Sequence, residues 1–445
     1  MYYNNTRWLK FMYVSLTIFI ITIFLMILAI MFKPNIKLYK FSVSTFWLVT
    51  LLGSIIVLLT SSVDLSNLFT NMTSGKMNPI KILVLFISLS MISISLDELN
   101  FFNFIANKTI SLSKGNQYKI FFTIYILVSI LTIFTSNDIV ILTFTPFICL
   151  FSKKAKINPI PYLIAEFVCA NTYSMLLIIG NPTNIYLSSQ FDISFIEYLS
   201  KMYLPTIFAG LATLIVILLL FRHDLSKPIG NVEVEQINVK NKSLVIINLI
   251  ILFITTILLV ISNYINFEMW SICLTSLIVL SIILFIYSIV LKDKSYITNV
   301  YKRLPYNLIP FILSMYILVL SLKENGIIDY ISSFLDTLSI NNVSTTFTYI
   351  ISSTLCDNII NNIPMSVLFS SLLQGKSEIA LYSSIIGSNI GAYFTPIGAL
   401  AGIMWMSILK KHNINFTFLT FVKYGIILVT TAVISSALGL LIAFI

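Results

Sequence analysis

Residues 387–398 read Gly-Ser-Asn-Ile-Gly-Ala-Tyr-Phe-Thr-Pro-Ile-Gly and interrupt an apolar run that extends from about residue 379 to residue 409. Glycine and proline continue a helix poorly, because glycine loses more backbone entropy and proline lacks an N–H and clashes with the preceding turn. The first half of the chain carries a comparable interruption, Gly-Asn-Pro-Thr-Asn at 180–184, in a run from about 162 to 187. We therefore predict two broken helices, 162–187 and 379–409, whose freed N–H and C=O groups can face a solute.

The surrounding composition places these breaks in lipid. The chain has 445 residues, of which 58% are hydrophobic and 10% charged, and its mean hydropathy is +0.97. A spanning helix needs about 20 apolar residues, and many such runs occur here without the alternation of a barrel. The run 11–32 follows Arg7 and Lys10 but is too long for a signal core, so we expect a retained helix. Full spans are expected near 11–32, 43–60, 80–96, 203–221, 244–262, 269–291, 306–321 and 421–445.

Several classes of function fit the composition poorly. The net charge of +10 comes from basic residues scattered over short loops, which argues against nucleic-acid binding. The cysteines are single and lie in apolar segments, so neither a disulfide nor a metal site is expected. Both histidines fall in predicted loops, which leaves no acid, base and nucleophile set for an enzyme in the bilayer. We expect no cofactor.

Two further apolar segments, 120–150 and 343–373, are divided by polar residues. The first contains Thr-Ser-Asn-Asp at 135–138, and the second contains Cys-Asp-Asn at 356–358. Each arm is short for a full crossing, so we predict re-entrant hairpins whose tips lie in protein or in a water-filled cavity.

The same order of elements occurs twice, on either side of a charged linker at 222–243. Three helices are followed by a hairpin, a broken helix and a closing helix, which predicts repeats at 1–221 and 244–445. Five full crossings per repeat is an odd number, so the repeats are expected to be inverted. In this topology 20 of the 27 Lys and Arg residues share the side of the linker, which places the linker in the cytoplasm and the chain in the inner membrane.

The hairpin tips carry the residues most suited to ion or solute binding. Helix capping alone would account for Asn137, since four N–H groups at a helix start need partners. An intramembrane carboxylate such as Asp138 is costly and usually serves an ion or proton path. Asp357, Asn358, Asn361 and Asn362 exceed what capping requires, and their side chains offer donors and acceptors to a small solute.

Other acidic residues are interpreted more simply. Glu166 lies a few residues inside its predicted helix and is expected to snorkel to the surface or cap the helix. Asp97 and Glu98 end a predicted helix and are expected to be solvated.

At these motifs the sequence resembles the arsenite/antimonite efflux permeases and the wider ion transporter superfamily, which includes sodium/proton antiporters and citrate or dicarboxylate carriers. The resemblance is carried by 387–405, where a Gly-x-Asn turn precedes Thr-Pro-Ile-Gly-Ala-Leu-Ala and a tryptophan. Shorter matches occur at 136–138 with 145–146, at 361–364 and at 191–205. The resemblance implies a central site where hairpins and unwound helices meet, and export of a trivalent metalloid hydroxide against proton entry.

Two departures from the permease pattern bear on the assignment of the substrate more than on the assignment of the family. This chain has Ala170-Asn171-Thr172 where the permeases tend to carry an aspartate, which removes one proton carrier. The break at 180–184 is closer to the Gly-x-Pro-x-Asn of the wider superfamily.

The leading hypothesis is a secondary transporter that exports arsenite or antimonite against protons. The alternative is a sodium-coupled carrier of a small anion, or a sodium/proton antiporter, in which Asn137 and Asn358 help to hold cations. A channel or a lipid-handling protein fits the broken helices less well. Expected partners are the solute, a proton or sodium ion and membrane lipid, with a cytoplasmic ATPase subunit and a homodimer left open. The predicted site residues are Ser136, Asn137, Asp138, Gly180, Asn181, Pro182, Thr183, Asn184, Asp357, Asn358, Asn361, Asn362, Gly387, Ser388, Asn389, Thr395 and Pro396, with Asp138 and Asp357 as proton-coupling candidates.

Overall fold

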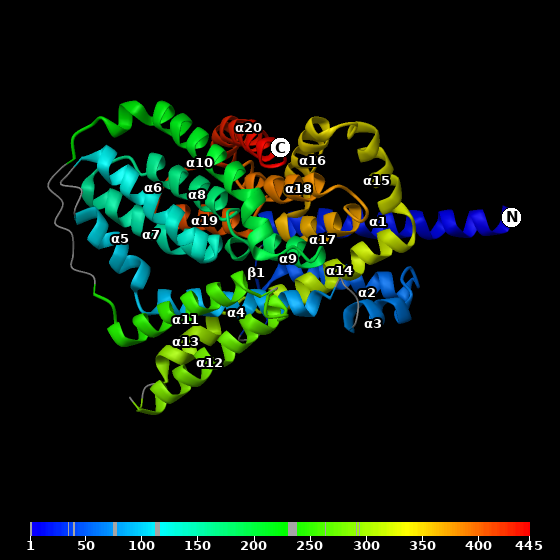
Figure 1. Ribbon diagram of the computed structural model, residues 1–445, viewed down its shortest axis with the longest axis horizontal. Helices are drawn as coiled ribbons and strands as arrows, with labels where there is room; N and C mark the ends of the chain where they lie inside the picture. The colour runs from blue at the N-terminus through cyan, green and yellow to red at the C-terminus, as the bar shows by residue number, and fades with distance from the viewer. Residues whose placement is uncertain are drawn as a thin grey trace.

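The computed structural model describes residues 2–33, 35–38, 41–73, 78–111, 116–229, 238–262, 264–290, 292 and 294–445. The described chain is almost entirely helical, which confirms the predicted all-α membrane fold (Figure 1). Its described strands are β1 (Asn35–Leu38) and β2 (Phe41–Ser44), an antiparallel pair in which Ile36 lies opposite Val43. The predicted linker includes residues 230–237, which lie outside the described residues.

The first half contains long helices, a helical hairpin and a broken helix. Its helices are α1 (Tyr2–Phe32), α2 (Thr45–Leu59), α3 (Leu65–Thr73), α4 (Pro79–Glu98), α5 (Phe101–Ser111), α6 (Gln117–Phe134), α7 (Asn137–Ala155), α8 (Ile160–Tyr173), the 3-10 turn η1 (Ile178–Gly180), α9 (Pro182–Gln190) and α10 (Phe195–Leu225).

The second half contains elements of the same kinds. Its helices are α11 (Lys242–Val260), α12 (Met269–Val290), α13 (Ser295–Arg303), α14 (Leu308–Glu324), α15 (Ile327–Leu338), α16 (Asn342–Ile360), α17 (Asn362–Leu372), α18 (Glu378–Gly391), α19 (Leu400–Lys411) and α20 (Phe418–Ala443). Across the described residues, 8 helical segments are long and apolar enough to cross a membrane.

One expectation about the hairpins is wrong. The arms α6 and α7 contain 18 and 19 residues, and α6 is among the segments long and apolar enough to cross a membrane. The first arm was expected to be short because its predicted start was residue 120. The Asn116 side chain in fact accepts a hydrogen bond from the Lys119 N–H and starts the helix at Gln117.

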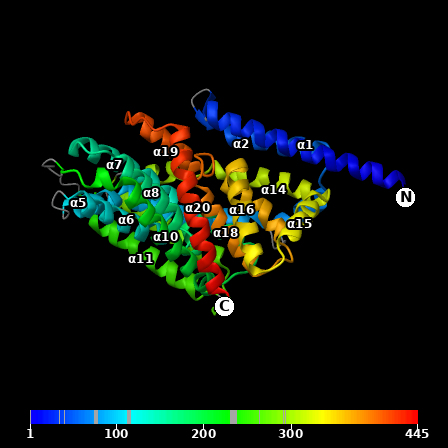
Figure 2. The same cartoon turned by 90° about the horizontal axis from the view of Figure 1, so that it is seen from above.

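The helices of the two halves pack against each other in reciprocal pairs. Helix α2 packs on α14, and α12 packs on α4. The arm α7 packs on α19 of the second half, while α17 packs on α9 of the first half. The last helices of the halves, α10 and α20, also pack together, and α20 crosses the front of the molecule in Figure 2. The hairpins and the broken helices of the two halves therefore contact each other.

Candidate transport site

The two unwound stretches meet through the side chain of Asn389. Its Nδ2 donates to Asn184 Oδ1 at 2.7 Å, and its Oδ1 accepts from Asn181 Nδ2 at 2.9 Å. The Ser174 hydroxyl also lies 3.0 Å from Asn389 Oδ1, and the Ser388 hydroxyl donates to Thr183 Oγ1 at 2.7 Å. All these side chains are buried. The network therefore ties α18 to the start of α9 across the two halves.

This amide network satisfies its own hydrogen-bonding groups. The second N–H of Asn389 donates to Ile385 O, the Asn184 amide donates to Ser174 O, and Asn181 Oδ1 accepts from the Thr183 N–H. A side chain whose donors and acceptors are already paired has little left for a ligand. Asn181, Asn184 and Asn389 thus hold the breaks together in this conformation.

Replacement of Asn389 by alanine should lower stability sharply. The change leaves Asn184 Oδ1 and Asn181 Nδ2 buried without a partner, at a cost of about 1–3 kcal/mol for each group. We expect a clear fall in the melting temperature of the purified protein in detergent. Asn342→Ala, at an exposed asparagine of α16, is the matched control and should melt like wild type. Equal melting temperatures for both variants would contradict this role of the network.

The tip of the second hairpin is fastened to the unwound residues 392–399. Asn358 Nδ2 donates to Gly391 O at 3.0 Å, and its Oδ1 accepts from the N–H and the hydroxyl of Thr395. Asn361 Nδ2 donates to Ile397 O, and the Asn362 N–H donates to Gly398 O. Asn361 has φ of 75°, which lets the chain reverse between α16 and α17. Hairpin tip and broken helix therefore form one unit.

Asp357 lies in this unit without any hydrogen-bond partner. The side chain is fully buried, and neither carboxylate oxygen has a partner in the described part of the chain. Asn361 Oδ1 is also buried and unpaired. A Cβ on Gly391 would lie 2.5 Å from Asp357 Oδ2, so the glycine is what admits the carboxylate. Buried polar groups are nearly always paired, so such unpaired acceptors suit a proton or a cation.

The tip of the first hairpin has a different arrangement. Asn137 Nδ2 donates to Asn171 Oδ1 on α8 at 3.0 Å, while Asn137 Oδ1 is buried and unpaired. Asp138, in the first turn of α7, has no hydrogen bond or ion pair among the described residues and lines a cavity. Ser136 lines the same cavity. The capping explanation for Asn137 is wrong: its amide bonds to Asn171, and the N-cap of α7 is Ser136, whose side chain makes no cap hydrogen bond.

The cavity at Asp138 has a volume of about 540 Å³ and lies between the halves. Leu400 and Met404 of α19 line it, together with Ser90 of α4 and Arg303 of α13. Arg303 donates to Asp97 at 2.6 Å and to Glu98 at 2.7 Å. The expectation that these two acidic side chains are solvated is wrong, since they are 11% and 13% exposed and paired with Arg303. The guanidinium charge at this cavity is therefore already balanced.

A second cavity, of about 620 Å³, lies along the other part of α4. It is lined by Asn78, Lys81 and Leu85, whereas the Asp138 cavity begins at Phe86. Lys81 forms an ion pair with Glu268 beside it, and this hydrogen bond holds the pKa of the Glu268 carboxyl below its usual range. Two hollows thus approach the centre of the molecule from opposite ends of one helix.

Glu166 is the site residue that the sequence interpretation missed. The side chain is fully buried, so the expectation that it snorkels or caps its helix is wrong. Its Oε1 lies 3.1 Å from Thr145 Oγ1 on α7, and its Oε2 accepts from Trp405 Nε1 on α19 at 3.2 Å. The apolar residues on both sides of Glu166 were a signal for burial. Its closeness to the predicted helix end favoured the surface position instead.

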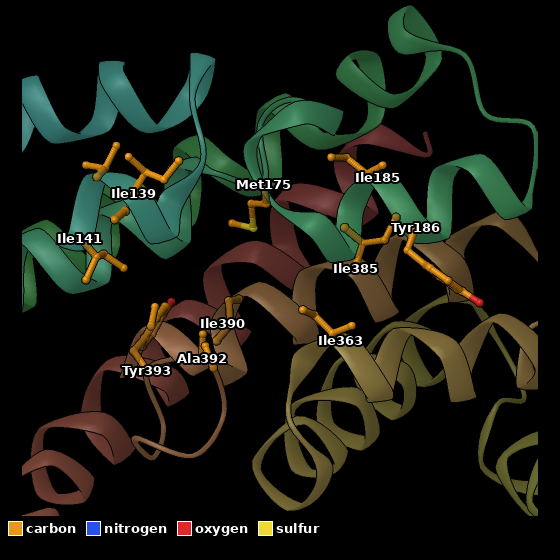
Figure 3. Packing of buried hydrophobic residues seen from close by; sticks show 14 of the residues in the cluster. Ile139, Ile141, Met175, Ile185, Tyr186, Ile363, Ile385, Ile390, Ala392 and Tyr393 are labelled. Carbon is orange, nitrogen blue, oxygen red and sulfur yellow. The ribbon is translucent and has the colours of Figure 1, made fainter. Parts of the chain in front are cut away.

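The predicted residues fall into three groups. Asn181, Thr183, Asn184, Ser388 and Asn389 lie together at the centre, as described above. Asp357 and its asparagines form the second group, and Ser136, Asn137 and Asp138 form the third. Figure 3 shows buried apolar side chains from both halves packed together, including Met175 of the first unwound stretch and Ile385 and Ile390 of α18. Gly180, Pro182 and Pro396 lie at the breaks, and Pro182 opens α9. Gly387 lies inside α18, where it packs on Ile350 O and Ser353, so the second break begins after Gly391 and not at Gly387 as predicted.

Comparison with known proteins supports a transporter. The citrate transporter family model matches residues 26–384. The arsenical pump membrane protein of Escherichia coli strain K12 is 27% identical over 360 residues, which cover 77% of this chain and 82% of the relative. That of Yersinia enterocolitica is 25% identical over 359 residues, with the same coverage. The crystal structure of the Alcanivorax borkumensis YdaH transporter has a similar fold, with a TM-score of 0.56 and 12% identity over 98% of each chain. The chain is a membrane transporter and belongs to the citrate transporter family.

Proposed function

We propose that this protein is a secondary transporter that exports arsenite or antimonite in exchange for protons. The observation that carries the proposal is that two unpaired carboxylates lie where the described residues offer no buried, unpaired cation. Neither Asp138 nor Asp357 forms a hydrogen bond or ion pair in the described part of the chain. Of the basic residues that line the Asp138 cavity, Arg303 is paired with Asp97 and Glu98, and Lys302 is exposed. A citrate or dicarboxylate would meet these carboxylates without a buried positive charge to offset them, whereas a neutral trihydroxide can donate hydrogen bonds to them.

The arrangement also supports two inverted repeats, 1–221 and 244–445, joined by the linker. Under a two-fold relation, if a first helix packs on the counterpart of a second helix in the other half, then the second helix must pack on the counterpart of the first. The pairs of α2 with α14 and α4 with α12 fit this relation, as do α7 with α19 and α9 with α17. Because most Lys and Arg residues lie on the side of the linker, we place the linker in the cytoplasm and the chain in the inner membrane.

The relatives support the proposed chemical class of the substrate. The relatives of Escherichia coli and Yersinia enterocolitica are arsenical pump membrane proteins, and the sequence motifs at 387–405 resemble the same permeases. We assign arsenite as the substrate of this chain because a small neutral hydroxide suits the unpaired acceptors Asp138, Asp357 and Asn361.

A sodium-coupled carrier of a small anion is the second candidate. It is favoured by the oxygen atoms of Asp357 and Asn361, which are the ligands that hard cations prefer, and by the description of the family as citrate transporters. A sodium/proton antiporter would use the same oxygens.

Expression in an arsenite-sensitive bacterial host separates the candidates. We expect the chain to restore growth on arsenite and to lower the arsenic content of the cells. The double variant Asp138→Asn with Asp357→Asn, expressed to the same level, should give no protection. A lack of protection by the wild type, together with sodium-dependent citrate uptake into vesicles, would exclude the arsenite assignment.

A further inference from the structure

Glu166 joins three helices from both halves of the protein. It belongs to α8, contacts Thr145 on α7, and accepts a hydrogen bond from Trp405 on α19. Its side chain is fully buried, and no Lys, Arg or His pairs with it in the described part of the chain. Trp405 packs against Phe167, Phe416 and Phe421, with ring centroids 5.2 to 5.7 Å apart, and these rings separate the carboxyl from the surface.

A count of hydrogens favours a protonated carboxyl in this conformation. The Thr145 hydroxyl lies 2.6 Å from Ile141 O and 3.1 Å from Glu166 Oε1. A threonine hydroxyl has a single hydrogen, and the shorter contact with a carbonyl acceptor requires it. The contact with Glu166 is then filled only if the carboxylic acid donates to Thr145. The other oxygen, Oε2, accepts from the indole N–H of Trp405, so the neutral acid satisfies every group.

The surroundings offer no charge that would stabilise the ionised form. The titratable groups that face Glu166 are the thiols of Cys149 on α7 and Cys169 on α8, and Cys169 in turn lies 3.8 Å from Tyr125 O on α6. The basic side chains of α7 and α19 stand in the exposed last turns, namely Lys153, Lys154, Lys410 and Lys411. Loss of the proton would therefore leave a buried, unpaired charge, which costs several kcal/mol.

The second half lacks this carboxyl at the matching place. Helix α8 ends at Tyr173 and α18 ends at Gly391, so Asn171 matches Asn389 and Glu166 matches Ser384. Ser384 is also fully buried, but its hydroxyl donates to Ala380 O within its own helix. A small serine is thus enough to fill the equivalent position. The carboxyl of Glu166 exceeds what packing requires.

The helices that hold Glu166 also line the cavity at Asp138. On α19, Met404 lines the cavity and the next residue, Trp405, contacts Glu166. On α7, Asp138 and Leu142 line the cavity, and Thr145 follows one turn later. Any shift of α19 against α7 on solute binding would thus break or remake the hydrogen bonds of Glu166.

We propose that Glu166 is a proton-carrying site of the transport cycle, protonated while α7, α8 and α19 are packed and deprotonated when α19 separates from them. The proton leaves the carboxyl for water as the packing opens and returns to it as the packing closes. This inference rests on the proposed proton-coupled exchange, and it adds a carboxyl away from both hairpin tips.

Glu166→Gln tests the proposal without loss of the packing. The glutamine amide can donate to Thr145 and accept from Trp405 as the neutral acid does, but it cannot release a proton. At neutral pH, the infrared spectrum of purified wild type minus that of the variant should contain a carboxylic-acid carbonyl band that shifts in heavy water. In everted vesicles, proton-driven arsenite accumulation should fall by about tenfold or more, while arsenite binding changes less than about threefold. Ser384→Ala should leave all three measurements unchanged.

The outcomes separate this inference from the proposed substrate. If the wild-type spectrum minus the Glu166→Gln spectrum contains no carboxylic-acid band, or if accumulation equals wild type, the role of Glu166 is overturned. Failure of the wild type to accumulate arsenite would instead refute the proposed substrate. The infrared comparison still decides in that case whether Glu166 holds a proton.

Discussion

Asp138→Asn should abolish proton-driven transport while leaving the fold intact. The side chain has no partner to lose among the described residues and lines an open cavity, so the amide fits without a new clash. The amide cannot exchange a proton and presents N–H donors where the carboxylate presents acceptors. We expect arsenite transport in everted vesicles to fall by about 100-fold, which corresponds to about 2.7 kcal/mol.

The matched control for this variant is Asp329→Asn. Asp329 is an exposed carboxylate of α15, so the same chemical change there should leave transport unaltered. Expression and melting temperature of both variants should equal those of wild type. Wild-type transport by Asp138→Asn under a proton gradient would remove Asp138 from the coupling mechanism.

Gly180→Ala should prevent folding of the first unwound stretch. A Cβ at Gly180 would lie 2.2 Å from Ser174 O, a backbone atom that cannot turn aside as a flexible side chain could. Asn184 donates to the same Ser174 carbonyl, so a shift of that carbonyl would also disturb the network at Asn389. We expect a destabilisation of about 4 kcal/mol or more, seen as loss of folded protein in detergent.

Gly375→Asn is the control for this substitution. Gly375 has φ of 73° and nothing within 4 Å of an added Cβ, and asparagine tolerates this backbone conformation. The variant should therefore fold and melt close to wild type. If Gly180→Ala yields as much folded protein as Gly375→Asn, the close approach at Ser174 does not exist in the native protein.

The breaks were predictable because glycine and proline act locally. The α-helices are interrupted at 174–181 and 392–399, close to the predicted breaks, but the bounds differ: α8 already ends at Tyr173, and α18 continues through Gly387 to Gly391. The positions of Asn358 and Asn362 at a helix turn follow in the same way from the polar residues that divide an apolar segment. What these asparagines bond to could not be predicted, since Thr395 and Gly398 are distant in sequence.

The missed features depend on contacts between distant segments. Glu166 is buried by Trp405, and Asp97 with Glu98 is covered by Arg303, more than 200 residues later in the chain. A hydropathy pattern places such residues along one helix but does not say what packs on it. The short helices α3, α5, α13 and α15 were missed for a related reason, because each is too short to register as a span.

The most direct test of the proposed exchange is the internal pH of everted vesicles that contain the protein. Respiration first acidifies the interior, and arsenite is then added outside. Exchange predicts that arsenite raises the internal pH of wild-type vesicles as protons leave, with no such change in Asp138→Asn vesicles or without the protein. Arsenite accumulation with no movement of protons, or an equal pH change in Asp138→Asn, would contradict proton-coupled export through this site.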